Sequence, residues 1–170
     1  MSEEIVNKVA SSGLITLDLK EFYPQGERIL LDIRNWLFQD LILKEKDFRD
    51  HLSQHDWTCY QDKFVAVTCS SEAIIPTWAY MLISLQLEPY AKKIVFGNTE
   101  VLETVLMEEA LSKIDFSTFQ DSRVVIKGCG DLAISTHAFV KITAKLKPYV
   151  KSLMYGEPCS TVPLYKRKSL

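Results

Sequence analysis

One stretch of this chain occurs twice, and the repetition restricts the fold more than any other feature of the sequence. Residues 52–97 and residues 111–156 align without a gap at a constant offset of 59 positions. Roughly 14 of about 46 aligned residues are identical, where chance composition gives about 3. The identities include acidic, proline and glycine positions, among them Asp56 and Asp115, Asp62 and Asp121, Pro89 and Pro148, and Gly97 and Gly156. The sequence therefore predicts two copies of one structural unit.

Each copy has the pattern of a strand, a loop, a helix and a second strand. In the first copy residues 64–68 form a short β-branched run, residues 69–73 a polar loop, residues 76–87 an apolar helix and residues 93–96 a strand. In the second copy the corresponding segments are residues 124–127, 128–133, 135–146 and 152–155. Strands that alternate with helices of this length are typical of βαβ units with right-handed crossovers. We predict an α/β fold with a mixed, largely parallel sheet flanked by helices.

The residues before the first copy supply two further strands. Apolar and polar residues alternate from Ile15 to Lys20, and residues 29–33 form a second apolar run. Pro24 and Gly26 lie between them and have the chemistry of a turn, so we predict an N-terminal β-hairpin that adds an antiparallel edge to the sheet. Residues 37–43 are apolar but too short to distinguish strand from helix, and residues 44–54 have helical periodicity.

The length of 170 residues is enough for one domain with its own hydrophobic core. We predict a single domain, residues 1–170, in which residues 1–51 carry the hairpin and a helix and residues 157–170 form an extended tail. The formal charge is −2, which speaks against nucleic-acid binding. No apolar run approaches the ~18 residues of a membrane span, and the first residues lack the pattern of a secretory signal. We therefore expect a cytoplasmic protein with cysteines in the thiol form.

The helix of the first copy is apolar on almost every side, whereas its counterpart is amphipathic. Trp78, Tyr80, Met81 and Leu85 lie among other apolar residues, while lysines interrupt the second helix. A helix of the first kind is buried on two sides. This pattern predicts that either the N-terminal segment or a second subunit covers the helix. In the second case the chain forms a homodimer joined through the helix around Trp78 and the C-terminal tail.

Candidate site residues follow from the rule that ligands bind at the carboxyl ends of parallel strands. Three cysteines follow predicted strand ends: Cys69, Cys129 and Cys159. Thiolates are ligands of zinc, so these residues with His137 are the predicted metal site, Glu157 and Asp131 being alternative fourth ligands. Two other interpretations remain open: one cysteine is a reactive thiol, or all of them only fill space in the core. For a small-molecule ligand the candidates are Ser70, Ser71, Glu72, Asp131 and Glu157.

Other motifs carry less information. His51 and His55 have the spacing of paired metal ligands on a helix, but Ala110 and Ile114 occupy the equivalent positions of the second copy, which favours packing. No phosphate-binding loop is present, and the glycines of residues 128–131 are too few for a nucleotide site. The motifs define no reaction.

Several segments carry a resemblance to a known group of proteins: ITLDLKEFYP, LFQDLILKEKDFR, CSSEAIIPTWAYM, AKKIVFG, VVIKGC and MYGEPCSTVPLYKR. Together they resemble a family of uncharacterised bacterial proteins, a domain of unknown function that spans the whole chain. The resemblance implies a bacterial, single-domain protein and supplies no activity or cofactor. Two hypotheses therefore remain: a metal or small-ligand site at the carboxyl edge of the sheet, or a non-catalytic interaction module that forms a homodimer.

Overall fold

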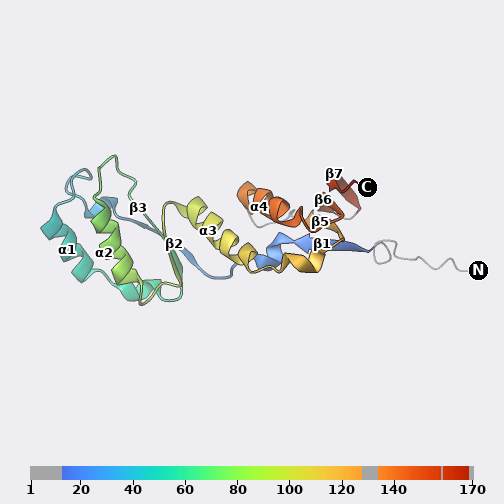
Figure 1. The fold of residues 1–170 in the computed structure, drawn as a ribbon. Helices are drawn as coiled ribbons and strands as arrows, with labels where there is room; N and C mark the ends of the chain where they lie inside the picture. Colours follow the sequence, from blue (N-terminus) through green and yellow to red (C-terminus); the bar gives the residue numbers. More distant parts are fainter. Residues whose placement is uncertain (1–12, 128–133, 158, 169–170) are drawn as a thin grey trace, which may run out of the picture. The chain divides into compact units, whose positions relative to one another are not determined.

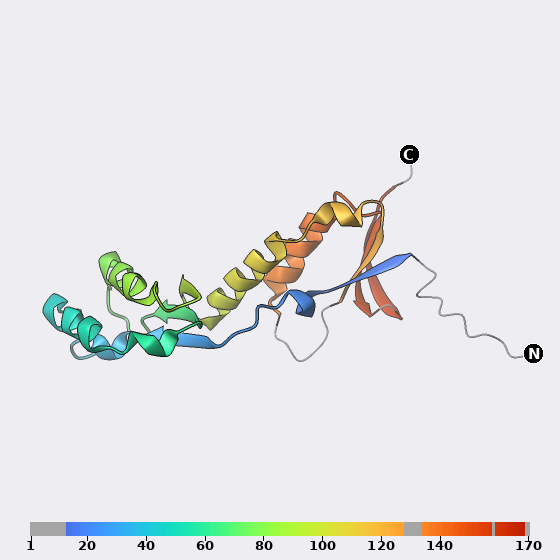
Figure 2. The ribbon, with the colours of Figure 1, turned by 90° about the horizontal axis from the view of Figure 1, so that it is seen from below.

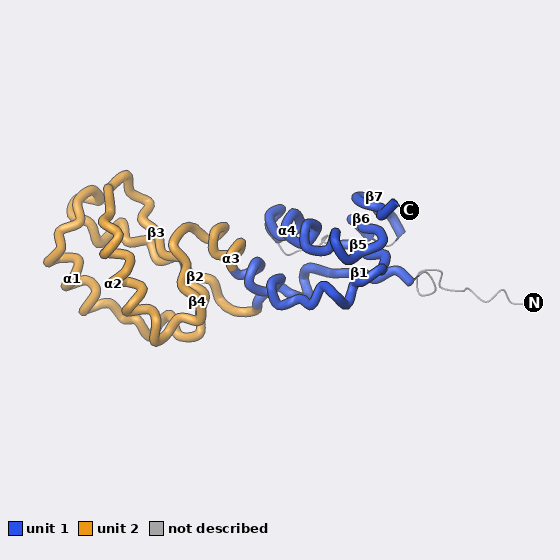
Figure 3. Tube along the Cα trace, in the orientation of Figure 1, with its two compact units in different colours: residues 1–24, 106–170 blue, residues 25–105 orange. Residues whose placement is uncertain are grey.

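The computed structural model describes residues 13–127, 134–157 and 159–168 and divides the chain into two compact units. Unit 1 contains residues 1–24 and 106–170, and unit 2 contains residues 25–105 (Figure 3). Each unit is built around its own sheet with helices packed on it, so the predicted α/β class is confirmed. The boundary between the units falls inside one helix, α3 (Thr99–Ser112).

Unit 2 is built on a parallel sheet with the strand order β2-β3-β4. The strands are β2 (Arg28–Asp32), β3 (Phe64–Thr68) and β4 (Lys93–Phe96), and the helices packed against them are α1 (Glu45–Gln54) and α2 (Thr77–Leu87) (Figure 1). The described residues also form four short 3-10 helices. Two belong to unit 2, at Arg34–Trp36 and Trp57–Tyr60, and two to unit 1, at Leu19–Phe22 and Phe116–Phe119. Val65 and Val67 of β3, Phe48 of α1 and Ile83 of α2 meet in one buried core.

Unit 1 is built on a mixed sheet with the strand order β1-β5-β6-β7. Its strands are β1 (Leu14–Asp18), β5 (Arg123–Lys127), β6 (Ser152–Glu157) and β7 (Ser160–Lys166), and α4 (Thr136–Leu146) packs against them (Figure 2). The first three strands are parallel, and β7 is antiparallel to β6. Val124, Leu153, Ile142 and Met107 belong to its core.

The prediction of an N-terminal β-hairpin is wrong. β1 lies in the sheet of unit 1 and pairs in parallel with β5, whereas β2 lies in the sheet of unit 2 and pairs in parallel with β3. The alternating pattern correctly marks both strands, but each one pairs with the first strand of one copy and is buried in that unit's core. Leu17 is buried with Val124, and Leu31 with Val65.

Residues 37–43 form neither a regular strand nor a helix. A single antiparallel bridge joins Phe38 to Ile42, and the turn between them places Gln39 and Asp40 at φ 51° and 59°. Leu37 is buried, while Phe38 and Ile42 are exposed. The run therefore anchors one residue in the core and presents a tight turn at the surface.

The final segment follows the predicted extended path and is a strand of the sheet. Glu157 is the last residue of β6, and β7 returns along β6. Arg167 then fixes the end of the strand, since its guanidinium contacts the Asp121 carboxylate and donates to the carbonyl oxygen of Tyr149 at 2.9 Å.

The two copies contain equivalent elements at the offset read from the sequence. β3 and β5 begin 59 positions apart, as do α2 and α4. Asp62 and Asp121 have positive φ angles of 58° and 56°, and each donates its N–H to a tyrosine carbonyl at 2.9 Å. A common origin of the two copies stays a prediction, as does their organisation in a single domain.

Candidate functional site

A polar hollow lies beyond the carboxyl ends of β2 and β3 in unit 2. Its volume is about 310 Å³, and its lining is Arg34, Gln39, Asp40, Leu41, Ser70, Ser71 and Glu72. Three of the five predicted ligand-binding residues, Ser70, Ser71 and Glu72, thus share one hollow. The rule that ligands bind at the carboxyl edge of a parallel sheet identifies the same location.

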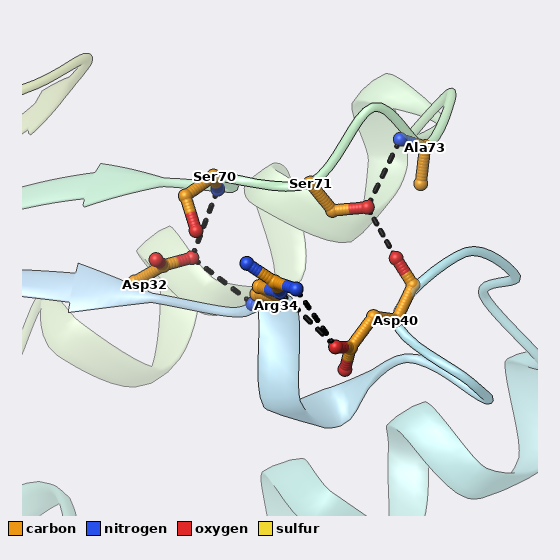
Figure 4. A network of polar contacts seen from close by, with 6 residues as sticks. All are labelled: Asp32, Arg34, Asp40, Ser70, Ser71 and Ala73. Atoms are coloured by element: carbon orange, nitrogen blue, oxygen red, sulfur yellow. Dashed lines mark hydrogen bonds and ion pairs between the residues drawn. The ribbon is translucent and has the colours of Figure 1, made fainter.

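Asp32, the last residue of β2, connects the two loops that line this hollow. Its Oδ1 accepts the backbone N–H of Arg34 and the backbone N–H of Ser70, each at 3.0 Å (Figure 4). One carboxylate therefore ties the loop after β2 to the loop after β3. Burial raises the pKa of the Asp32 carboxyl, but hydrogen bonds from the hydroxyl and amide of Ser70 and from the amide of Arg34 outweigh it, and the pKa lies below the ordinary value of an aspartate.

An ion pair between Arg34 and Asp40 lines one side of the hollow, and Asp40 belongs to a strained turn. The Nε and Nη2 atoms of Arg34 lie 3.1 and 3.0 Å from Oδ2 of Asp40, and both side chains are about half exposed (Figure 4). Gln39 and Asp40 hold left-handed backbone angles without being glycine, which costs on the order of 1 kcal/mol each. The Ser71 hydroxyl donates to the carbonyl oxygen of Asp40 and accepts the N–H of Ala73 at 3.1 Å, so it fixes the turn. Strain retained in this way is typical of functional sites.

The charges around the hollow are of both signs. Arg34 supplies a guanidinium, and Asp40 and Glu72 supply carboxylates beside the amide of Gln39 and the hydroxyls of Ser70 and Ser71. Its described lining contains no histidine or cysteine side chain. The arrangement suits the binding of a polar molecule by charge and hydrogen bonding.

The predicted metal ligands do not gather in the described residues. Cys69 is half-buried against the core of unit 2, and Cys159 is exposed in the turn between β6 and β7 of unit 1. The Nε2 atom of His137 lies 3.0 Å from Oε1 of Glu108, and Glu157 is 3.4 Å from the ammonium of Lys127. Within the described ranges no group of three or more His, Cys, Asp and Glu residues is arranged to hold a metal. Cys129 and Asp131 lie outside the described residues, so the metal site stays a prediction.

Sequence reasoning missed Asp32, Arg34 and Asp40, although a signal for two of them was present. LITLDLKEF at residues 14–22 and RILLDIRNW at residues 28–36 share an aspartate at the strand end, followed two positions later by a base. In unit 1 this aspartate, Asp18, accepts the N–H of Lys20 at 3.0 Å, as Asp32 accepts that of Arg34. A comparison of the two N-terminal strands would have identified this shared cap.

The cap yields a prediction about pH. Replacing Asp32 with alanine removes the acceptor of two backbone N–H groups and should lower the free energy of unfolding by about 1–2 kcal/mol at pH 7. Because the folded pKa of Asp32 lies below its unfolded pKa, the stabilisation is fully present above the unfolded pKa and is lost as the pH falls through the folded pKa. Urea unfolding from pH 7 to pH 2.5 should therefore show wild type and variant converging in acid. A difference that stays constant over this range would contradict the assignment.

The fold and the hollow define a two-unit α/β protein with a polar recess at the carboxyl edge of a parallel sheet. The chain belongs to the family described as proteins of unknown function, DUF2480, whose model matches residues 3–167. Comparisons with curated proteins and with solved structures gave no match. In the described residues no helix is both long and apolar enough to cross a membrane.

Proposed function

We propose that the protein binds a small zwitterionic molecule of amino-acid size in the hollow of unit 2, and that it does so in the cytoplasm. The observation that carries the proposal is the Arg34–Asp40 ion pair, in which Asp40 belongs to a strained turn. The same hollow is lined by Ser70, Ser71 and Glu72. A guanidinium next to carboxylates offers a partner to each end of a zwitterion.

The roles of the individual groups follow from their contacts. Among the described residues Arg34 uses Nε and Nη2 for Asp40, which leaves Nη1 for the carboxylate of a ligand. Glu72 is exposed at the rim and, with Asp40, accepts hydrogen bonds from the ammonium group. A volume of about 310 Å³ lies at the lower end of the range for ligand pockets, which fits an amino acid better than a nucleotide.

A titration with free amino acids tests the proposal. We expect at least one of the twenty to raise the melting temperature at millimolar concentration and to bind by calorimetry. Replacing Arg34 with glutamine should weaken that binding roughly 10- to 100-fold, because a hydrogen bond to a charged group contributes about 1.5–3 kcal/mol.

Arg49 gives a matched control for this variant. It is exposed and forms an ion pair with Glu45 at 2.9 Å, but it does not line the hollow. Arg49→Gln makes the same chemical change and should leave the affinity unaltered. Equal affinities of wild type and Arg34→Gln, or the absence of binding by every amino acid, would refute the proposed function.

A second function, as a homodimeric interaction module, is favoured by a different observation. Met81 and Leu85 of α2 and Phe96 of β4 are all more than half exposed in unit 2. Exposed apolar residues grouped on adjacent elements are typical of a protein interface.

A further inference from the structure

The parallel sheet of unit 2 ends at β4, which pairs only with β3 among the described residues. The apolar surface beside this edge is formed by Met81, Leu85 and Phe96, which are 62%, 68% and 66% exposed. The ring of Phe96 lies against Tyr80 of α2, at 4.8 Å between centroids, so strand and helix form one continuous surface. We call these four residues, Tyr80, Met81, Leu85 and Phe96, the β4 edge patch.

Unit 1 shows what covers the corresponding edge of its own sheet. The aromatic pair recurs there as Phe139 and Tyr155, at 5.6 Å between centroids and 59 positions further along the chain. Tyr155 lies on β6, and β7 runs antiparallel beside it with Val162 opposite Tyr155. Tyr155 is half-buried as a result, whereas its counterpart Phe96 is exposed. The same unit therefore exists in the molecule once with an added antiparallel strand and once without.

We propose that a second copy of the chain covers the β4 edge patch, by pairing its own β4 antiparallel to this one across a two-fold axis. This inference is independent of the ligand proposed above. A two-fold axis between Ile94 and Val95 places Lys93 opposite Phe96 of the partner subunit, and the two three-stranded sheets become one. Addition of a strand to a sheet edge is a common mode of recognition, and an isologous interface gives a closed dimer.

Charge supports this arrangement. Lys92 precedes β4, and Glu100 lies in the first turn of α3, shortly after β4 ends; both are exposed. In antiparallel pairing the start of each strand lies beside the end of the other, so Lys92 approaches Glu100 of the partner subunit. The contact occurs twice in a symmetric dimer and pairs opposite charges.

The exposed apolar area of the β4 edge patch is about half of what one partner contributes to a standard interface. At about 200 Å² for each large side chain, the exposed parts of Met81, Leu85 and Phe96 amount to roughly 400 Å². A standard interface takes about 800 Å² from each partner. Half of that area is thus apolar and contiguous, and the strand edge with Ser84, Glu88 and Lys92 supplies polar surface around it. Because small interfaces associate weakly, we expect a dissociation constant of the order of 10 μM.

Equilibrium sedimentation of the full-length chain tests the proposal. At about 100 μM the average mass of the wild type should approach twice the chain mass of 19.5 kDa, and it should fall on dilution. The double variant Met81→Lys, Leu85→Lys should raise the dissociation constant at least about 100-fold, because it places charges in the apolar interface. Both positions are exposed, so the variant should fold, which its circular dichroism verifies.

Equivalent positions in α4 provide a matched control. Val140 and Ala144 correspond to Met81 and Leu85, and Val140 is 66% exposed. Val140→Lys, Ala144→Lys should leave the dimer intact. Hydrogen exchange adds a second readout: amides of residues 94–96 should exchange more slowly at 100 μM than at 1 μM. The proposal would be overturned if the wild type were a monomer at every concentration, or if the exchange rates did not depend on concentration. It would also be overturned if the control changes broke the dimer and the Met81 and Leu85 changes did not.

Discussion

Phe48→Ala should lower the free energy of unfolding of unit 2 by about 3–5 kcal/mol, the cost of emptying a fully buried aromatic site. Phe48 is 0% exposed, and its ring lies 5.7 Å from Trp36 and 5.9 Å from Trp78, centroid to centroid. All three tryptophans of the chain, Trp36, Trp57 and Trp78, belong to unit 2. Their fluorescence therefore reports the urea unfolding of this unit.

The matched control for this variant is Phe48→Leu. Leucine keeps most of the apolar volume and should cost less than half as much as alanine. Phe48 would not belong to the core of α1, α2 and β3 if the alanine variant lost less than about 1 kcal/mol, or if both variants lost the same amount.

Deletion of residues 158–170 should have an effect of similar size on unit 1. The deletion removes β7, which pairs with β6 from Ser152 to Glu157, and it removes the packing of Tyr165 on the core. It also removes the contacts of Arg167 with Asp121 and Tyr149. We expect a loss of about 5 kcal/mol, comparable with the whole stability of a small domain.

Hydrogen exchange of the β5 amides measures this loss. In the truncated chain residues 124–126, which are buried in the wild type, should exchange at nearly the rate of an unfolded chain. Removal of residues 169–170 alone is the control and should change nothing, because β7 stays intact. Full protection of β5 after the longer deletion would mean that β7 is not part of the sheet.

The repeated elements were predictable because their signals are local. Residues 64–68 and 124–127 are short β-branched runs, and the helices after them carry the apolar residues Ile83 and Ile142 at equivalent positions. The structure has β3, β5, α2 and α4 at these places. The partner of a strand is not a local property, however, and parallel pairing joins residues far apart in the chain. For this reason β1 and β2 were correct as strands and wrong as a hairpin.

The candidate site was predictable only in part, for a similar reason. Ser70, Ser71 and Glu72 were found because they follow the end of β3. Arg34 and Asp40 come from a loop 30 or more positions earlier in the chain, and only the tertiary structure brings them to the same place. The turn at Gln39 and Asp40 has positive φ angles without a glycine, and a single aspartate is a weaker signal of such a turn than a glycine.

The two histidines with metal-ligand spacing are His51 of α1 and His55 at its C-terminal cap; His51 is exposed and His55 half-buried, and both contact the ring of Trp36. His51 stacks on Trp36 with their ring centroids 5.9 Å apart, and the His55 ring nitrogen lies 2.9 Å from the hydroxyl of Tyr60. Burial lowers the pKa of His55, while the charge of Asp56 opposes the shift. The comparison of the two copies favoured packing because Ala110 and Ile114 occupy the equivalent positions.

The most direct test of a ligand site at the carboxyl edge of the unit 2 sheet is a titration by two-dimensional ¹H–¹⁵N nuclear magnetic resonance. The titrant is the amino acid that raises the melting temperature most. We expect saturable shifts of the amide signals of Arg34, Ser70 and Ser71, with the signals of His137 and Cys159 unchanged. Shifts that do not saturate, or that cluster around α4 instead, would contradict a ligand site in the hollow formed by Arg34, Asp40 and the loop after β3.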